Sequence, residues 1–185
     1  ASPTGWHERG RSWHGCGPAC GARAAGWAKA ADGKWYYSEG AGAMRSGGWM
    51  KQGSSWYYLS GSGAMQTGWL SKGGSWYWLD PESGRMATGW AKASDGKWYY
   101  FEGSGAMRSG GWMKQGSSWY YLSGSGAMQT GWLSKGGSWY WLDPDSGAMA
   151  TGWAKASGAK WADFAGAGAV NDSPTRTPGD ARDSQ

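Results

Sequence analysis

The sequence contains few of the aliphatic side chains that fill most protein cores. Isoleucine is absent, valine and leucine are scarce, and only 2 phenylalanines occur among 185 residues. Low aliphatic content is typical of disordered chains, but 18 tryptophans and 10 tyrosines argue against disorder here. Most of the surface that this chain buries must therefore belong to indole and phenol rings.

Long apolar runs are also missing. None approaches the length of a membrane span, so we expect no transmembrane segment. No charged-then-apolar leader opens the chain, which does not begin with methionine. We therefore expect a fragment, or the C-terminal module, of a longer secreted protein.

Side chains that commonly hold metals are rare. The sequence has only two histidines, His7 and His14, and only two cysteines, Cys16 and Cys20. Their spacing matches no common zinc pattern. A local disulfide explains the two cysteines better if the protein is exported. The best interpretation of all four residues is that they are substitutions in a degenerate repeat. We predict no metal and no cofactor.

Catalytic patterns are equally scarce. The carboxylate pairs Asp80/Glu82 and Asp143/Asp145 each flank a proline, which marks a turn. No Ser-His-Asp order is present. We predict that the chain is not an enzyme and that any activity of a parent protein lies in another domain.

What the chain does contain is a repeat. Gly-Trp pairs occur at eight positions that lie 20 to 22 residues apart. A period of this length is a signature of solenoids. In the well-formed repeats a Trp-Tyr pair follows, then a Gly-rich turn and a methionine. Residues 43–81 recur identically as residues 106–144, which indicates recent duplication or deliberate assembly.

Each repeat has the pattern of a β-hairpin. In residues 49–59 a two-residue turn at Gln52-Gly53 would place Trp49 opposite Trp56. Because side chains alternate along a strand, two faces result, one carrying Trp49, Trp56 and Tyr58 and the other Met50, Tyr57 and Leu59. One hairpin cannot bury its own apolar face. We therefore predict an all-β solenoid of stacked hairpins.

The quality of the repeat divides the chain into four parts. Residues 1–25 form a degenerate N-terminal repeat, and residues 26–151 hold six well-formed repeats. Residues 152–165 form a failing C-terminal repeat, in which Ala162-Asp163 stands where two aromatic residues belong. Residues 166–185 contain no aromatic residue and are predicted to be a disordered tail.

The recurring aromatic face carries the functional signal. Some of these rings must form the core, but two tryptophans and a third ring per hairpin exceed what packing requires. Gaps between stacked hairpins would then be walled by π-faces. Such gaps attract an organic cation, and a quaternary ammonium suits them best because it has no N–H to satisfy.

The motif Gly-Trp-x-Lys, then Gly-x-x-Trp-Tyr-Tyr-Leu, then Gly-Ala-Met-x-Thr-Gly-Trp resembles the choline-binding (cell-wall-binding) repeat of bacterial surface proteins. The resemblance is strong over residues 26–153 and weak at the flanks. It implies a left-handed β-solenoid of stacked hairpins that anchors a protein to phosphocholine on teichoic acids. It also implies that each choline site takes two rings from one hairpin and a third from the next.

Carried onto this sequence, the resemblance implies five sites. They are Trp27, Trp35 and Tyr58; Trp49, Trp56 and Trp78; Trp69, Trp76 and Tyr100; Trp90, Trp98 and Tyr121; and Trp112, Trp119 and Trp141. Met65, Met86, Met107, Met128 and Met149 are candidate floors, although a methionine is more often core filler. A site from Trp6, Trp13 and Tyr37 would use a degenerate hairpin. Trp132 and Trp139 would meet Asp163, so their site is expected to be lost.

Two other binding functions compete with this one. Glucan-binding repeats share the Trp-Tyr-Tyr core, but sugars also need polar groups for their hydroxyls, and this face has few. Nucleic acid can stack on aromatic rings, but the net charge of +5 is small, and the lysines lie near turns. Lys29, Lys51, Lys72, Lys92, Lys114 and Lys135 are interpreted as edge protection, with anion binding as the alternative.

The resemblance thus predicts a secreted, non-catalytic module of the bacterial cell surface whose partner is choline or phosphocholine of teichoic acids. No nucleic acid and no membrane span are expected. Exposed aromatic faces at the ends of a solenoid favour association, which leaves a homodimer as an open alternative to a monomer.

Overall fold

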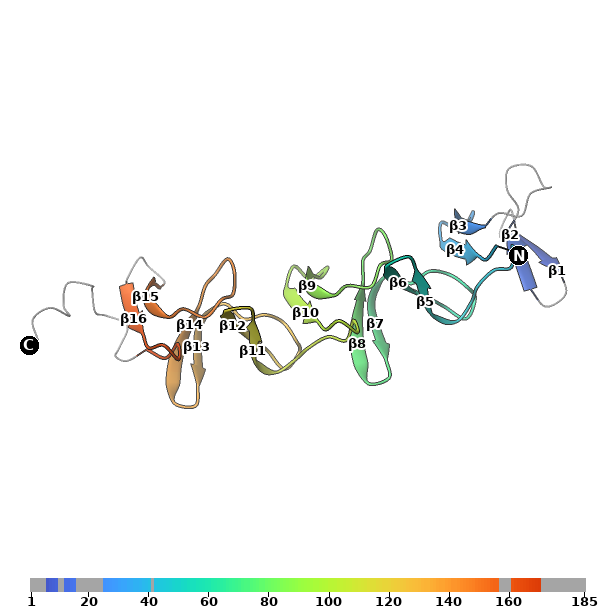
Figure 1. The fold of residues 1–185 in the computed structure, drawn as a ribbon. Helices are drawn as coiled ribbons and strands as arrows, with labels where there is room; N and C mark the ends of the chain where they lie inside the picture. The colour runs from blue at the N-terminus through green and yellow to red at the C-terminus, as the bar shows by residue number, and fades with distance from the viewer. Residues whose placement is uncertain (1–5, 10–11, 16–24, 41, 157–160, 171–185) are drawn as a thin grey trace, which may run out of the picture. The chain divides into compact units, whose positions relative to one another are not determined.

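The computed structural model describes residues 6–9, 12–15, 25–40, 42–156 and 161–170 (Figure 1). Within these residues all strands pair in two-stranded antiparallel hairpins, as the repeat predicts. They belong to two compact units, one reaching to Gly89 and including Gly103–Ala106, the other formed by Trp90–Glu102 and the residues from Met107 onward. Across the described ranges, no helix is long and apolar enough to cross a membrane.

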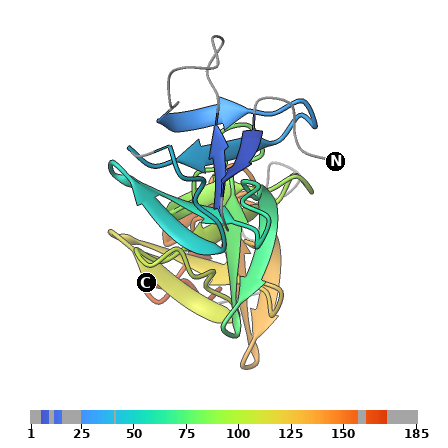
Figure 2. The same cartoon turned by 90° about the vertical axis from the view of Figure 1, so that its right-hand side faces the viewer.

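The first unit contains four hairpins. Their strands are β1 (Trp6–Arg9) with β2 (Ser12–Gly15), β3 (Gly26–Lys29) with β4 (Trp35–Ser38), β5 (Gly48–Gln52) with β6 (Ser55–Leu59), and β7 (Gly68–Lys72) with β8 (Ser75–Leu79). The second view shows that β5–β6 and β7–β8 run in clearly different directions (Figure 2). Successive hairpins in this unit are therefore rotated as well as stacked.

The second unit repeats this arrangement. Its strands are β9 (Gly89–Lys92) with β10 (Trp98–Phe101), β11 (Gly111–Gln115) with β12 (Ser118–Leu122), β13 (Gly131–Lys135) with β14 (Ser138–Leu142), and β15 (Gly152–Lys155) with β16 (Trp161–Phe164). The failing C-terminal repeat thus still forms a hairpin.

The register of the hairpins differs from the predicted one. Trp49 pairs with Tyr58, and the turn lies between Gln52 and Ser55, so Trp49 is not opposite Trp56. The reason is visible in the equivalent turn of β7–β8, where Gly73 and Gly74 have φ values of 58° and 78°. A two-residue turn of this kind needs positive φ at both central positions. The turn of residues 49–59 is therefore centred on residues 53 and 54, one residue later than the predicted Gln52-Gly53.

The assignment of the two faces is confirmed despite this shift. The register moves by an even number of residues, so each side chain stays on its predicted side. Met50, Tyr57 and Leu59 are buried, with exposed fractions of 2%, 7% and 1%, whereas Trp56 is 39% exposed. The buried face packs against Trp27 and Tyr37 of the preceding hairpin.

Within each unit, a short segment after a hairpin joins it to the hairpin before, and this bond is seen for five of the described hairpins. The amide of Met65 donates to the carbonyl of Trp35, and the amide of Met128 donates to the carbonyl of Trp98, both at 2.8 Å. Val170 makes the same bond to Trp139. The stack is therefore held by backbone hydrogen bonds as well as by ring packing, and buried backbone groups need such partners.

The methionine of each connecting segment lies against a glycine of the next turn. Gly147 has a φ of 73°, and a Cβ built on it would collide with the side chain of Met128. Gly84 lies against Met65 in the same way. The Gly-Ala-Met signature thus has two structural purposes, a left-handed backbone conformation and room for the thioether of the neighbouring repeat.

The flanks differ partly from their predicted organisation. Gly166–Val170, assigned to the tail by sequence, continues the last hairpin, since Phe164 bridges to Val170 and Ala165 donates to Ala169. The remainder of the predicted tail, like Cys16 and Cys20 of the N-terminal repeat, lies outside the described residues.

Substituting Gly147 tests the methionine–glycine contact. Gly147→Ala should lower stability by about 1–3 kcal/mol more than Gly137→Ala, because an overpacked neighbour must shift. Gly137 also has a positive φ, of 79°, but nothing lies within 4 Å of its added Cβ. Urea unfolding of both variants measures the difference, and equal losses would show that the contact with Met128 costs nothing.

A tyrosine–aspartate hydrogen bond gives the second unit a pH dependence. The Tyr99 hydroxyl donates to Oδ2 of Asp95 at 2.8 Å. Burial, together with this hydrogen bond and the charge of Asp95, raises the pKa of Tyr99 to about 12. Since the folded state holds this proton more tightly than an unfolded tyrosine with a pKa of about 10, the stability it contributes is present below pH 10 and is lost as pH rises towards 12.

The free energy of unfolding should therefore fall more steeply between pH 10 and pH 12 in the unmodified protein than in Tyr99→Phe. Denaturant melts across this interval measure the two slopes. Asp95→Asn is the companion variant, because it removes the acceptor carboxylate while the phenol stays. Parallel slopes for all three proteins would contradict the assignment to Tyr99.

Candidate functional site

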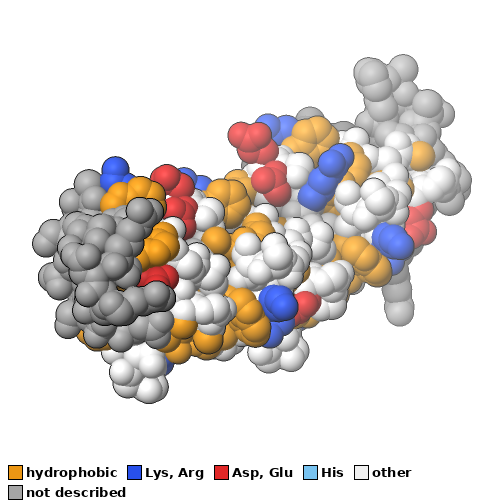
Figure 3. All heavy atoms as spheres, turned by 60° about the vertical axis from the view of Figure 1, so that its left-hand side comes forward, with side chains coloured by type: hydrophobic (Ala, Val, Ile, Leu, Met, Phe, Trp, Pro, Cys, Tyr) orange, Lys and Arg blue, Asp and Glu red, His pale blue; other side chains and the backbone are white. Residues whose placement is uncertain are grey.

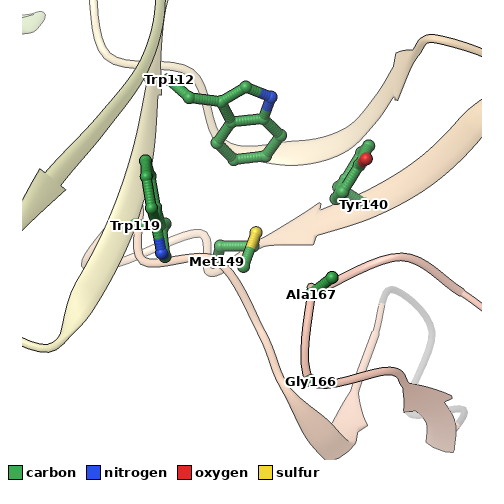
Figure 4. Close-up of a pocket in the computed structure, with 6 residues that line it drawn as sticks. All are labelled: Trp112, Trp119, Tyr140, Met149, Gly166 and Ala167. Carbon is green, nitrogen blue, oxygen red and sulfur yellow. The ribbon is translucent and has the colours of Figure 1, made fainter.

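The clearest site of the second unit is a cavity of about 300 Å³ between two stacked hairpins. Figure 4 shows Trp112 and Trp119 facing it from β11 and β12, with Tyr140 opposite from β14. Met149 lies between the rings, and Gly166 and Ala167 close one side. The walls are mainly π-faces and a thioether, which is the environment that a quaternary ammonium requires.

A second cavity of the same unit has the same composition. Trp90, Trp98, Tyr120 and Met128 line about 260 Å³, with Asp145 and Ser146 at its edge. The ring centroids of Trp90 and Tyr120 are 4.9 Å apart, and those of Trp112 and Tyr140 in the first cavity are 4.8 Å apart. The cage is therefore a repeated device of stacked hairpins.

The first unit brings equivalent residues together. Trp27 lies 4.9 Å from Tyr57, and Trp49 lies 4.9 Å from Tyr77, between ring centroids. The amides of Met65 and Met86 donate to the carbonyls of Trp35 and Trp56 at 2.8 Å. These contacts place two tryptophans, one tyrosine and one methionine at each of two further positions.

The strands and the connecting segment share the task of building each cage. Alternation puts the exposed tryptophan of the second strand, such as Trp98 at 40% exposure or Trp119 at 39%, on the outer face. The hydrogen bond from the following methionine amide then holds that methionine beside it. The tyrosine comes from the face of the next hairpin that packs against this one, and it is buried at Tyr57 and half-buried at Tyr77, Tyr120 and Tyr140.

The third ring of each cage differs from the one assigned by sequence. The structure brings Tyr57, Tyr77, Tyr120 and Tyr140 to the tryptophan pairs, in place of Tyr58, Trp78, Tyr121 and Trp141. A hairpin packs on its predecessor through the face that carries Met50, Tyr57 and Leu59 or their equivalents, and the tyrosine of that face contacts the preceding tryptophan. The outer ring pairs within its own hairpin instead, as Tyr58 does with Trp49 at 5.2 Å.

The remaining assigned sites have different outcomes. The set Trp69, Trp76 and Tyr100 joins residues of the two units and stays a prediction. Beside Trp132 and Trp139, the position expected for Asp163 is taken by buried Ala162, because the face of the last hairpin that carries Ala162 and Phe164 is the one packed against this pair. Trp132 contacts Phe164 instead, with ring centroids 5.9 Å apart. Met107 stays a prediction as a cage floor.

Few charged groups lie near the cages. Asp145 is the one charged residue lining the two described cavities. Lys51 and Lys114 place Nζ 5.9 and 5.8 Å from the ring centroids of Trp56 and Trp119, and these distances suit cation–π attraction. In Figure 3 basic side chains lie singly among acidic and uncharged ones.

The acidic turns have a structural explanation. Oδ1 of Asp80 accepts hydrogen bonds from the hydroxyl and the amide of Ser83, and these bonds lower the pKa of Asp80. Asp143 is held by Ser146 in the same way, which lowers its pKa too. Among the described residues, no group of three His, Cys, Asp or Glu side chains could hold a metal. His7 pairs with His14 across the β1–β2 hairpin.

The fold and the cages are those of a repeat module whose aromatic pockets suit small organic cations. Family models agree, since a choline-binding repeat matches residues 46–88, 82–112 and 109–153, and a putative cell wall binding repeat matches residues 25–44. The chain belongs to the choline-binding repeat family. This confirms the resemblance found in the sequence.

Solved structures give the same result. Choline binding protein F from Streptococcus pneumoniae is 35% identical over 91% of this chain and 57% of its own, with a TM-score of 0.71. CbpJ from Streptococcus pneumoniae is 38% identical over 90% and 57%, also with a TM-score of 0.71. No curated protein sequence matches the chain. The chain thus spans little more than half the length of these two structures.

A phage protein supplies one more comparison. The multimodular pneumococcal cell wall endolysin from phage Cp-1, solved in complex with choline, is 31% identical over 74% of this chain and 40% of its own, with a TM-score of 0.50. Repeats of this family therefore also occur in proteins that carry an enzyme domain.

Comparing Tyr120 with its neighbour tests which tyrosine completes a cage. Tyr120→Leu should remove choline binding at the Trp90 cage, because it deletes a π-face that lies 4.9 Å from Trp90. Tyr121→Leu should leave that cage intact, since Tyr121 pairs with Trp112 of its own hairpin at 5.2 Å. Calorimetric counts of choline sites on both variants decide. Loss of the Trp90 site in Tyr121→Leu alone would restore the assignment made from sequence.

Proposed function

We propose that this chain attaches a secreted protein to the bacterial cell surface by binding phosphocholine of teichoic acids in its aromatic cages. The observation that supports this best is the recurrence of one cage, two tryptophans, a tyrosine and a methionine, at four places in the described structure. Family membership and the choline complex of the phage endolysin support the ligand.

The physics of the cage explains the choice of ligand. A trimethylammonium group presents no N–H, so it loses little when its water is replaced by π-faces, and each ring offers its negative quadrupole. A sugar would need polar partners for its hydroxyls. In the two described cavities the polar side chains are those of Asp145 and Ser146 and the edges of the aromatic rings.

The repetition of the cage explains how individually weak sites can attach the chain firmly to a cell wall. A few cation–π contacts of about 1–2 kcal/mol each, less the cost of association, give affinities of about millimolar. Cages carried on one chain meet a polymer with repeated phosphocholine at high effective concentration, and avidity then exceeds single-site affinity by about 10²–10⁴. Any catalytic activity would belong to a domain outside these repeats, and a homodimer would add further sites.

The test has two parts, retention and stability. We expect the chain to be retained on an immobilised quaternary amine and on choline-bearing cell walls, and to elute with free choline. Choline at ten times the dissociation constant should stabilise the fold by about 1–2 kcal/mol per occupied site, because a ligand of the folded state acts by mass action. Thermal melts with and without choline measure this.

Sodium chloride at equal ionic strength is the control for the melts. An unchanged melting temperature in choline, or elution from the walls by salt alone, would refute the proposed ligand. Retention on dextran with no response to choline would favour the glucan-binding function instead.

A further inference from the structure

The duplicated segment places two copies of one cage in the two units. Residues 43–81 and 106–144 are identical, so Tyr57 of the first unit corresponds to Tyr120 of the second. Both tyrosines lie 4.9 Å from the first tryptophan of their cage. The two cages therefore start from the same rings at the same distance, and any difference must come from residues outside the identical segment.

The first charge difference beyond the identical segment lies four residues past Pro81. Arg85 stands where the second copy has Ala148. The neighbouring acidic position is shared, since Glu82 corresponds to Asp145 and each follows a proline. The two copies of this turn therefore differ by one positive charge, contributed by Arg85.

Arg85 reaches its cage through the tyrosine. Its Nε donates to the hydroxyl of Tyr57 at 3.4 Å across a partly buried contact. Tyr57 is buried at 7% exposure, whereas Tyr120, which has Ala148 nearby, is only partly buried. The guanidinium therefore covers the hydroxyl end of one cage tyrosine and leaves the equivalent ring uncovered in the other unit.

The rest of this guanidinium is available to a ligand. Arg45 and Arg108 are engaged in ion pairs with Glu39 and Glu102, at 3.1 and 3.3 Å. Arg85 is exposed, and in the described part of the chain the bond to Tyr57 is its one side-chain hydrogen bond. A guanidinium has five N–H donors in a planar fork that matches phosphate oxygens.

From this arrangement we infer that the Trp27 cage is a zwitterion site, in which the rings hold the trimethylammonium of phosphocholine and Arg85 binds its phosphate. The copy at Trp90 has Ala148 in place of the arginine and recognises the ammonium alone. The inference rests on the proposed function and adds a specificity-determining residue to it. A positive charge at the edge of the Trp27 cage also disfavours free choline, which carries no anion to offset it.

Nearby acidic groups do not cancel this difference. Asp80 is held by Ser83 and by the backbone of its own turn, and its counterpart Asp143 is held identically by Ser146. Glu82 has its counterpart in Asp145. The charges of Asp80 and Arg85 also attract each other. Because both acidic positions occur in both copies, the arginine remains the one charge by which the two turns differ.

Site-resolved titration tests the inference on the full chain. Labelling methionine methyl groups with ¹³C lets Met65 report the Trp27 cage and Met128 report the Trp90 cage in one sample. We expect Arg85→Ala to weaken phosphocholine binding at Met65 about threefold to tenfold, the range of a partly exposed charged hydrogen bond. Choline affinity at Met65 should rise by less than about twofold, because an exposed charge repels choline only weakly, and neither affinity should change at Met128.

The reverse graft and a charge control complete the design. Ala148→Arg should raise the phosphocholine-to-choline preference at Met128 towards that of Met65. Arg45→Ala removes the same charge from an ion pair with Glu39 and should leave both preferences unchanged. Raising the salt concentration should shrink the Arg85 effect, because exposed charges are screened.

Phosphocholine occurs on wall polymers and on lipid headgroups, and a last comparison separates these sources. If retention on choline-bearing walls depends on Arg85, the wall polymer is the source of the phosphocholine. If cosedimentation with phosphatidylcholine vesicles depends on Arg85, the lipid headgroup is the source. A phosphocholine-to-choline preference at Met65 that is the same with and without Arg85 would overturn this inference alone. Absence of any shift with either ligand would overturn the proposed function together with it.

Discussion

Within each unit, successive hairpins are tied by a backbone hydrogen bond from the amide of a connecting residue, methionine in four of the five cases described, to a tryptophan carbonyl of the hairpin before. The bonds from Met65 to Trp35 and from Met149 to Trp119 are 2.8 and 2.7 Å long. An isolated two-stranded hairpin is marginally stable. This bond, with the ring packing that surrounds it, makes a stack from units that could not stand alone, as in other solenoids.

The same bond builds the aromatic cage. It brings the methionine beside the exposed tryptophan, while the buried face of the next hairpin supplies the tyrosine. Structure and function therefore use the same contacts, and a cage exists only where two hairpins are stacked. The last tryptophan pair shows the consequence. The carbonyl of Trp139 accepts the backbone bond from Val170, but Ala162 stands where the other pairs meet a tyrosine.

Duplication gives such a chain more sites without a new fold, and divergence at the edges of the repeat can then tune single sites. Arg85 and Ala148 illustrate this. They lie outside the identical segment, in a turn whose backbone bonds are the same in both copies. The exposed turn tolerates the change because it contributes no ring to the core, yet it lies close enough for Arg85 to hydrogen-bond to Tyr57.

Period, alternation and composition were enough to predict the all-β hairpin repeat, its two faces and the paired tryptophans of each cage, because these depend on local backbone geometry. The third ring could not be predicted, since it depends on which face of the next hairpin meets the cage. Sequence favoured Tyr58, and the structure places Tyr57 there. Neighbouring side chains on a strand point to opposite faces, so only the packing between hairpins decides between them.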